Sequence, residues 1–318
     1  MPKKDAIEII YQDADILVIN KPTGLSVTKD RSRDEELLPV LLEQLNTSAT
    51  EDTEDTENSE VDENKSKACP ERSEWIQNLK SKIGLLLVHR LDKETSGVMI
   101  LAKNKDAQRQ FSSYFTKGQI KKTYLALVAG AVTQDEGTID APIGSNRKDP
   151  RFMAIDFGKR GKKAVTNWRL LADFGNAALV AVSPITGRTH QIRVHLPSMG
   201  MPLAIDPLYG NSEGLMLSSF KTNYRLGKWQ EEKPLIERLT LHAYQIELPP
   251  SAKDHSHPLS ALGVMAMPPN QQPATIFVAK LDKKFAATIK MLAKHNSRGL
   301  AAFKNPDILA AILDGKPL

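Results

Sequence analysis

The sequence predicts an α+β protein built on a mixed, largely antiparallel β-sheet with flanking helices. Two observations favour this fold class. Expected strands outnumber expected helices, and turn-forming residues often separate neighbouring strands by too few residues for the helical crossover that a parallel pair needs. With 318 residues the chain can bury a sizeable core, either as one large domain or as two smaller ones.

The N-terminal part of the chain predicts a hairpin followed by a helix. Apolar runs at 7–11 and 16–19 flank the turn-forming segment Asp13-Ala14-Asp15. The Lys-Pro-Thr-Gly segment at 21–24 then interrupts the chain. Within 34–45, leucines recur at helical spacing, so we expect a helix there.

Residues 46–73 have an acidic, polar composition with few apolar side chains. Such a composition buries too little apolar surface to order the chain, so we expect a disordered insertion here. Eight acids lie between Glu51 and Glu63 without a lysine or arginine, and leaving out these eight charges raises the net charge from +5 to +13. The rest of the chain is therefore basic, as suits a polyanionic partner, although scattered lysines can also serve solubility alone.

The remainder of the chain alternates between expected strands and a few helices. Strands are expected at 84–88, 98–102, 124–128, 163–171, 177–183, 191–196, 239–248 and 275–278. Helices are expected at 105–115, which Gly118 ends, and near the C-terminus at 285–292 and 306–313.

Two segments combine charged residues with strand-forming apolar residues. The first, His89 to Gly97, reads H-R-L-D-K-E-T-S-G and places the carboxylate of Asp92 on an expected loop between two apolar strands. The second, Gly187 to His195, reads G-R-T-H-Q-I-R-V-H. On spacing alone, an aspartate that caps a turn explains the first segment at least as well as catalysis does.

Six motifs in the same order resemble the RluA family of RNA pseudouridine synthases. They are Asn20-Lys21-Pro22-Thr23-Gly24-Leu25, the Asp92 segment, Lys122-Thr123-Tyr124, the Gly187 segment, Asp206-Pro207-Leu208-Tyr209-Gly210 and Leu241-His242-Ala243. The resemblance implies an α+β catalytic domain at 1–250 that contains the insertion at 46–73, with a central RNA-binding cleft across the sheet. Residues 251–318 form a C-terminal extension that we expect to pack on this domain or complete it.

The resemblance also implies roles for individual residues. Asp92 is the expected nucleophile, Arg193 its ion-pair partner, and Tyr124 the tyrosine that stacks on the target base and removes the C5 proton. A cation beside Asp92 is chemically sensible, because burial alone would raise a carboxyl pKa and neutralise the nucleophile. Without the resemblance, Tyr124 would be interpreted as a core strand aromatic and Arg193 as part of a surface ion pair. Substrate-binding roles are predicted for Arg90, which would help to extrude the nucleotide, and for Lys21, Leu91, Arg188 and His190.

Cofactors and metals have no support in the sequence. Neither G-x-x-x-x-G-K-[ST] nor G-x-G-x-x-G occurs, so no nucleotide cofactor is expected. His190 and His195 are five positions apart, unlike a helical zinc motif, and in a strand they would point to opposite faces, so no metal is expected. His89 and His242 are interpreted as hydrogen-bonded structural residues.

The expected compartment is the cytoplasm, and the expected state is a monomer. The single cysteine, Cys69, excludes an internal disulfide framework. No apolar segment follows the N-terminus, and no apolar run approaches the ~18 residues that span a bilayer, so secretion and membrane insertion are not expected.

RNA is the expected partner, either ribosomal or transfer RNA. A basic cluster that could contact phosphates comprises Arg147, Lys148, Arg151, Lys159, Arg160, Lys162 and Lys163. Ribosomal RNA is slightly preferred, because Ala141-Pro142-Ile143-Gly144 and the following basic residues resemble ribosomal-RNA-directed members of the family. Three functions stay open: a cofactor-free uridine isomerase, an RNA-binding protein of the same fold without catalysis, and a glycosidic-bond hydrolase. The hydrolase would need a second carboxylate, for which Glu94 is the nearest candidate.

Overall fold

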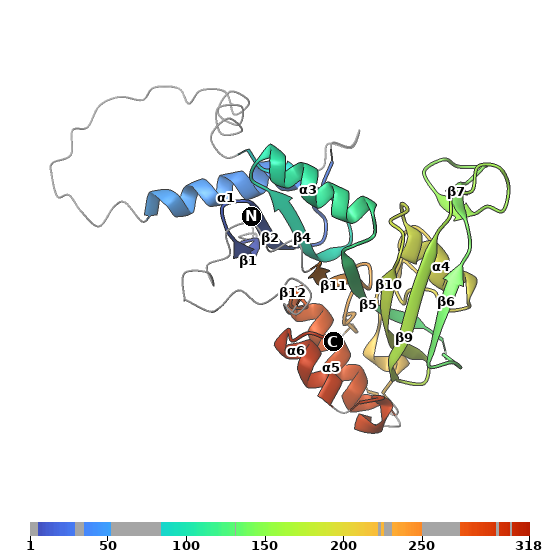
Figure 1. The fold of residues 1–318 in the computed structure, drawn as a ribbon. Helices are drawn as coiled ribbons and strands as arrows, with labels where there is room; N and C mark the ends of the chain where they lie inside the picture. Colours follow the sequence, from blue (N-terminus) through green and yellow to red (C-terminus); the bar gives the residue numbers. More distant parts are fainter. Residues whose placement is uncertain are drawn as a thin grey trace.

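The computed structural model describes residues 6–28, 35–51, 84–130, 132–221, 224–225, 231–249, 274–296, 299–305 and 307–318. Its main feature is a ten-stranded sheet (Figure 1). The strands of this sheet are β1 (Glu8–Gln12), β2 (Ile16–Lys21), β3 (Leu86–Leu87), β4 (Ser96–Ala102), β5 (Lys121–Ala129), β6 (Glu136–Asp140), β9 (Val165–Asp173), β10 (Ala177–Pro184), β11 (Leu241–Leu248) and β12 (Thr275–Val278).

The strands run in the order β1-β2-β4-β11-β5-β10-β9-β6, and β3 pairs with β4 and β12 with β11 at the side of this path. The pairing of β4 with β11 is parallel, and the other described pairings are antiparallel. A separate hairpin joins β7 (Ile143–Ser145) to β8 (Met153–Ile155). The expected mixed, largely antiparallel sheet is thus confirmed.

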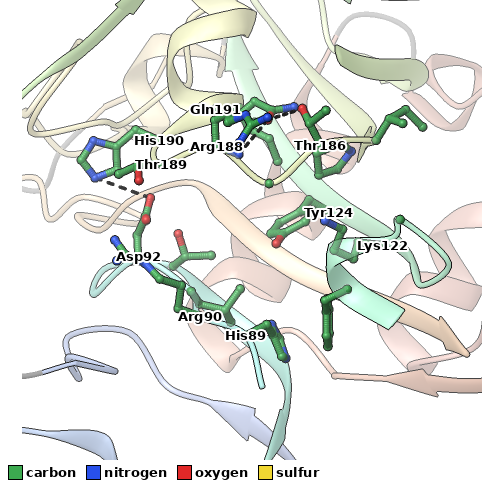
Figure 2. Close-up of a pocket in the computed structure, with 18 of the residues that line it drawn as sticks. His89, Arg90, Asp92, Lys122, Tyr124, Thr186, Arg188, Thr189, His190 and Gln191 are labelled. Atoms are coloured by element: carbon green, nitrogen blue, oxygen red, sulfur yellow. Dashed lines mark hydrogen bonds and ion pairs between the residues drawn. The ribbon is translucent and has the colours of Figure 1, made fainter. Parts of the chain in front are cut away.

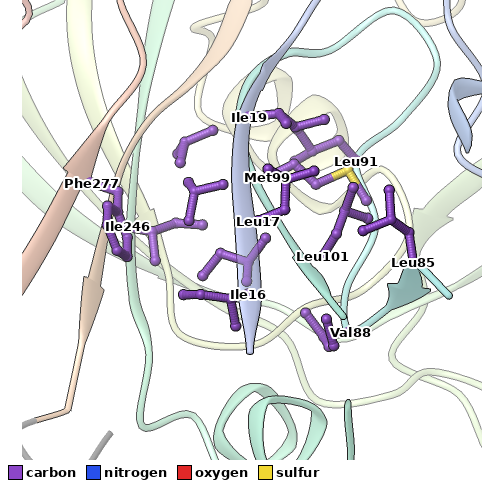
Figure 3. Packing of buried hydrophobic residues seen from close by; sticks show 14 of the residues in the cluster. Ile16, Leu17, Ile19, Leu85, Val88, Leu91, Met99, Leu101, Ile246 and Phe277 are labelled. Carbon is purple, nitrogen blue, oxygen red and sulfur yellow. The ribbon is translucent and has the colours of Figure 1, made fainter. Parts of the chain in front are cut away.

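Helices cover the sheet in several places (Figure 1). They are α1 (Leu37–Glu51), α3 (Lys105–Thr116), α4 (Gln191–Ser198), α5 (Lys283–His295) and α6 (Asp307–Asp314), with short 3₁₀ turns η1 (Leu217–Ser219) and η5 (Gly299–Ala302). One buried cluster joins α1 and α3 to β2 and β4, and its labelled members in Figure 3 include Leu17, Met99, Leu101 and Leu91. Because Leu91 belongs to this cluster, the loop that carries Asp92 is anchored in the core.

The described part of the C-terminal stretch joins the same structure. β12 adds a strand beside β11, and α5 buries Phe285 and Ile289 against apolar residues of β5 and β10. The hydroxyl of Tyr244 in β11 donates to the carbonyl of Lys316 at 2.7 Å. The expected boundary near residue 250 lies outside the described residues, since 250–273 are not described.

Most predicted elements are found, but residues 191–196 are a helix and not the predicted strand. The apolar residues Ile192, Val194 and Leu196 alternate as in a strand. In the structure all residues from Gln191 to Leu196 are buried, so the pattern carries no helical periodicity. Two smaller differences concern β3, which has only two residues, and α1, which continues to Glu51 and so enters the segment expected to be disordered. The rest of that segment up to residue 73 lies outside the described residues.

Within the described residues, no helix combines the length and the apolar character that crossing a membrane requires.

Candidate active site

A cavity of about 660 Å³ lies between the Asp92 loop, β5 and the segment that leads from β10 into α4 (Figure 2). Its volume falls within the usual range of about 300–1,000 Å³ for small-molecule sites. The predicted site residues that line it are Asp92, Tyr124, Arg193, Arg90, Leu91, Arg188 and His190. Segments that lie far apart in the sequence therefore meet in one pocket.

The Asp92 loop connects β3 to β4 and is fixed at both ends. Before Asp92, Leu91 is buried in the core, and after it the backbone N–H of Thr95 donates to the carbonyl of Asp92 at 3.1 Å. Gly97 follows with a φ of 120°, and a Cβ there would lie 2.1 Å from the carbonyl oxygen of Ala243 in β11. Only glycine fits at this position, because β4 and β11 run side by side in parallel here.

Lys21 also anchors the Asp92 loop, and it does not line the pocket. Its side chain is fully buried, and its ammonium donates to the carbonyls of Pro22, Lys93 and Thr95 at 3.0, 2.9 and 3.0 Å. Burial lowers the pKa of Lys21 to about 7, against the opposing effect of the carboxylates of Glu94 and Asp92. The substrate contact predicted for Lys21 therefore does not match its position, because its ammonium donates to two backbone oxygens of the Asp92 loop and to the carbonyl of the neighbouring Pro22.

Arg193 lies between two carboxylates. Its Nη1 is 3.5 Å from Oδ2 of Asp92, so the predicted ion pair is present. Its Nε and Nη2 donate to Oδ2 and Oδ1 of Asp206 at 2.9 and 2.6 Å. Burial by itself lowers the pKa of Arg193, but the hydrogen bonds and charge of Asp206 and the charge of Asp92 raise it overall. The guanidinium next to Asp92 therefore stays charged.

His190 presents its ring to Asp92 from the start of α4. Its Nε2 lies 3.9 Å from Oδ2 of Asp92, and its Nδ1 lies 2.7 Å from the hydroxyl of Tyr209. That hydroxyl already accepts the backbone N–H of Met153 at 2.8 Å, so its own hydrogen is available to Nδ1. Burial lowers the pKa of His190. When the Tyr209 hydroxyl donates to Nδ1, the neutral ring carries its hydrogen on Nε2, the nitrogen nearer to Asp92.

The backbone at His190 is held in an unusual conformation. Its φ is 54°, the only positive value at a described non-glycine residue. Such a conformation costs about 1–3 kcal/mol and persists where the surroundings fix it. Here Gln191 fixes the turn, because its Oε1 accepts from the Thr186 hydroxyl and its Nε2 donates to the Thr166 hydroxyl, at 2.7 and 2.8 Å.

Tyr124 lies near the middle of the sheet, on β5 between β10 and β11. Burial raises the pKa of its phenol, and the negative charge of Asp92 raises it further. The phenol is therefore protonated at neutral pH. A role in removing the C5 proton requires that Tyr124 passes its own proton on as the reaction proceeds.

The remaining predicted residues fall into two groups. Arg90 and Arg188 are exposed at the pocket, and Nε of Arg188 donates to the carbonyl of Lys163 at 2.9 Å. His89 and His242 are hydrogen-bonded as predicted: His89 Nε2 accepts the N–H of Ile100 at 2.9 Å, and His242 Nδ1 lies 2.8 Å from the Ser96 hydroxyl. Among the residues that the structure describes, no group of three or more potential ligands could hold a metal ion.

Sequence reasoning gave no role to Asp206, Tyr209 and Gln191, although they position Arg193, His190 and the turn before α4. Asp206 and Tyr209 both belong to the Asp-Pro-Leu-Tyr-Gly motif. Their side chains meet the Gly187 segment only in the folded chain. The motif could therefore be recognised in the sequence, but the sequence alone did not show which residues Asp206 and Tyr209 contact.

Comparison with known proteins gives consistent matches. A model of the RNA pseudouridylate synthase family matches residues 15–198. The ribosomal large subunit pseudouridine synthase D of Borreliella burgdorferi is 33% identical over 243 residues, which cover 74% of this chain and 66% of that protein. The dual-specificity RNA pseudouridine synthase RluA of Yersinia pestis is 30% identical over 239 residues, which cover 75% of this chain and 90% of that protein.

A solved structure agrees with these sequence matches. Human RNA pseudouridylate synthase domain containing 4 superimposes with a TM-score of 0.54 at 27% identity, covering 90% of this chain and 92% of that one. The family match contains Asp92, Tyr124 and Arg193, which the pocket brings together. From the ordered motifs, the sheet and these matches, we conclude that the chain belongs to the RluA family of RNA pseudouridine synthases.

Proposed function

We propose that this protein converts specific uridines of structured RNA into pseudouridine without a cofactor, with Asp92 as the nucleophile. The observation that carries the proposal is the position of Asp92, whose side chain is 20% exposed in the pocket, 3.5 Å from the charged Arg193. A carboxylate that is partly exposed to the pocket and lies beside a cation is accessible to a substrate, which a nucleophile needs. Family membership supplies the type of reaction.

The reaction breaks the bond between N1 of uracil and C1′ of the ribose and forms a bond between C5 and C1′. Asp92 can serve this exchange by attacking C6 of the base or C1′ of the sugar, or by helping to eliminate a sugar proton. In each route the proton of C5 leaves and N1 gains a proton, so that the product is an isomer of the substrate. The pocket therefore has to retain the detached uracil while it turns.

Hydrolysis of the glycosidic bond is less well supported by the geometry. A hydrolase of this kind usually needs a second carboxyl group as acid or base. Glu94, the candidate from the sequence, accepts a hydrogen bond from Thr23 at 3.2 Å and is not among the residues that line the pocket. Asp206 has both oxygens bound to Arg193 and a side chain that is only 3% exposed. Neither is placed to activate water.

Ribosomal RNA is the substrate that we prefer over transfer RNA, with the protein acting as a monomer in the cytoplasm. The Borreliella relative is named for the large ribosomal subunit, whereas the Yersinia relative is named for dual specificity. The basic cluster near the β7–β8 hairpin supports contact with a large RNA, because its Arg147, Lys148, Lys159 and Arg160 are exposed.

The test is product analysis with unmodified ribosomal and transfer RNA transcripts labelled with tritium at C5 of uridine. The proposal predicts tritium release and pseudouridine in the digested ribosomal RNA, without free uracil. Free uracil would show a hydrolase. Tight RNA binding without either product would show a binding protein that lacks catalysis.

A further inference from the structure

The pocket extends past the residues assigned to chemistry, toward Lys122 on β5. Lys122 precedes Tyr124 by two residues, so both side chains leave the strand on the same face, about 7 Å apart along it. In the view of Figure 2, Tyr124 lies between Asp92 and Lys122. Lys122 therefore occupies the end of the pocket away from the proposed nucleophile.

The ammonium of Lys122 has no counter-charge in the described part of the chain. Burial is the sole cause that lowers its pKa, and no carboxylate opposes this effect. Its neighbour Lys121 provides a contrast: it is exposed, on the other face of β5, and its Nζ lies 2.9 Å from Oε1 of Glu247. A half-buried cation without an anion carries a desolvation cost that an incoming anion would offset.

Lys122 lines the pocket, so its side chain borders space that a ligand can enter. A Cβ placed on Gly187 would lie 3.9 Å from the Nζ of Lys122, so the ammonium stands beside exposed backbone of the Gly187 segment. On another side lies His89, whose pKa is lowered to about 3 by burial and, less strongly, by the charge of Lys122. The His89 ring is stacked on Phe115 with centroids 4.2 Å apart. One cation and an aromatic pair thus line this end of the pocket.

We propose that Lys122 binds a backbone phosphate next to the target uridine and so positions the nucleotide whose base contacts Tyr124. The proposal rests on the proposed function, because the RNA substrate supplies the phosphate. An ammonium is a compact point charge that binds phosphate oxygens without a fixed orientation. The phosphate supplies the negative charge that the protein does not place near Lys122, and the short distance to Tyr124 lets one stretch of RNA occupy both positions.

The test compares Lys122→Met, Lys122→Arg and the matched control Lys121→Met with the wild type. Tritium release from the RNA that the wild type modifies gives kcat and KM at several salt concentrations. Lys122→Met should raise KM roughly tenfold to hundredfold, the effect of losing one hydrogen bond to a charged group, with kcat little changed. The slope of log(kcat/KM) against log[salt] should become shallower by about 0.7, for one lost phosphate contact with single-stranded RNA. Lys122→Arg should recover most of the loss, and Lys121→Met should match the wild type.

Three results would overturn the phosphate site. Lys122→Met could leave KM and the salt slope unchanged, or it could lower kcat alone. The third such result is a rise in KM in Lys121→Met that equals the rise in Lys122→Met. Filter binding of the same RNAs separates this inference from the proposed function. If the wild type binds RNA but releases no tritium, the proposed function fails, and the dissociation constants and salt slopes of the same variants still decide whether Lys122 binds phosphate. Thermal melting of each variant, with Lys122→Gln as a second neutral replacement, identifies a folding defect.

Discussion

Arg193 is bound more closely by Asp206 than by Asp92: two hydrogen bonds of 2.9 and 2.6 Å hold it to Asp206, and its nearest approach to Asp92 is 3.5 Å. Asp206 therefore sets the position from which Arg193 reaches the proposed nucleophile. The backbone N–H groups of Leu208 and Tyr209 in turn donate to Asp206, at 3.0 and 3.1 Å. The Asp-Pro-Leu-Tyr-Gly motif is thus a support for the cation and not only a wall of the pocket.

Asp206→Asn should reduce both stability and turnover. Removing one charge from this pair, whose side chains are 5% and 3% exposed, leaves a buried guanidinium partly uncompensated, at a cost of about 3 kcal/mol. Turnover should fall because Arg193 moves toward Asp92. The matched control is Asp149→Asn, since Asp149 also lies 2.6 Å from its partner Arg151 but at the surface. Urea unfolding measures the loss of stability, and tritium release measures the loss of turnover. If Asp149→Asn lowered the unfolding free energy and the turnover as much as Asp206→Asn does, the role given to Asp206 would be wrong.

Lys21→Met should loosen the Asp92 loop. The substitution keeps most of the buried volume but removes three hydrogen bonds, at a cost of about 1–3 kcal/mol. The carbonyls of Pro22 and Thr95 lose the ammonium, and the carbonyl of Lys93 keeps the N–H of Gly24. Hydrogen exchange should become faster in the segment from Asp92 to Thr95, and kcat should fall. Lys121→Met, on the exposed face of β5, should change neither. Unaltered exchange in the Lys21 variant would show that the loop does not depend on this lysine.

Tyr124→Phe should keep RNA binding and lose turnover by roughly 10²- to 10⁴-fold, the usual contribution of a group that transfers a proton. Burial and the charge of Asp92 raise the pKa of the phenol, so the hydroxyl is protonated when RNA binds. The ring face remains available for stacking in the variant. Single-turnover tritium release and filter binding separate the two steps. Wild-type release by the Tyr124→Phe protein would mean that the hydroxyl has no part in moving the C5 proton.

We expect the folded protein to lose stability in acid because the buried ring of His242 has a lowered pKa. Burial lowers its pKa to about 4 from an ordinary 6.5, although the hydrogen bond to the Ala279 carbonyl opposes this shift. Since the unfolded chain binds the proton more readily, the stability that the neutral ring provides is complete above pH 6.5. It is lost as the pH falls toward 4, by up to about 1.4 kcal/mol per pH unit.

His242→Gln provides the measurement for this pH effect, because an amide can replace the contacts to Ser96 and Ala279 without titrating. Unfolding free energies between pH 6.5 and 4 should show a shallower pH dependence in the variant. His89, with a pKa lowered to about 3, should leave part of the dependence in place. Identical slopes in both proteins would refute the assignment to His242.

The sequence predicted the sheet better than it predicted the site. Apolar runs such as 16–19 and 98–102 became central strands because they are buried on both faces, where apolar character alone identifies them. Burial on all sides also led to the wrong prediction of a strand at 191–196, because a helix that is buried on all sides shows no polar face. Contacts such as Arg193 with Asp206, or Lys21 with the Asp92 loop, depend on how distant segments pack. No local pattern contains that information.

The central claim is that Asp92 is the nucleophile, and Asp92→Asn tests it most directly. Asparagine keeps the shape of the side chain and removes its charge. Tritium release from C5-labelled uridine in unmodified ribosomal RNA should be easily measured with the wild type and absent with the variant, while both proteins bind the RNA with similar dissociation constants. Release at the wild-type rate by a folded Asp92→Asn protein would contradict the account.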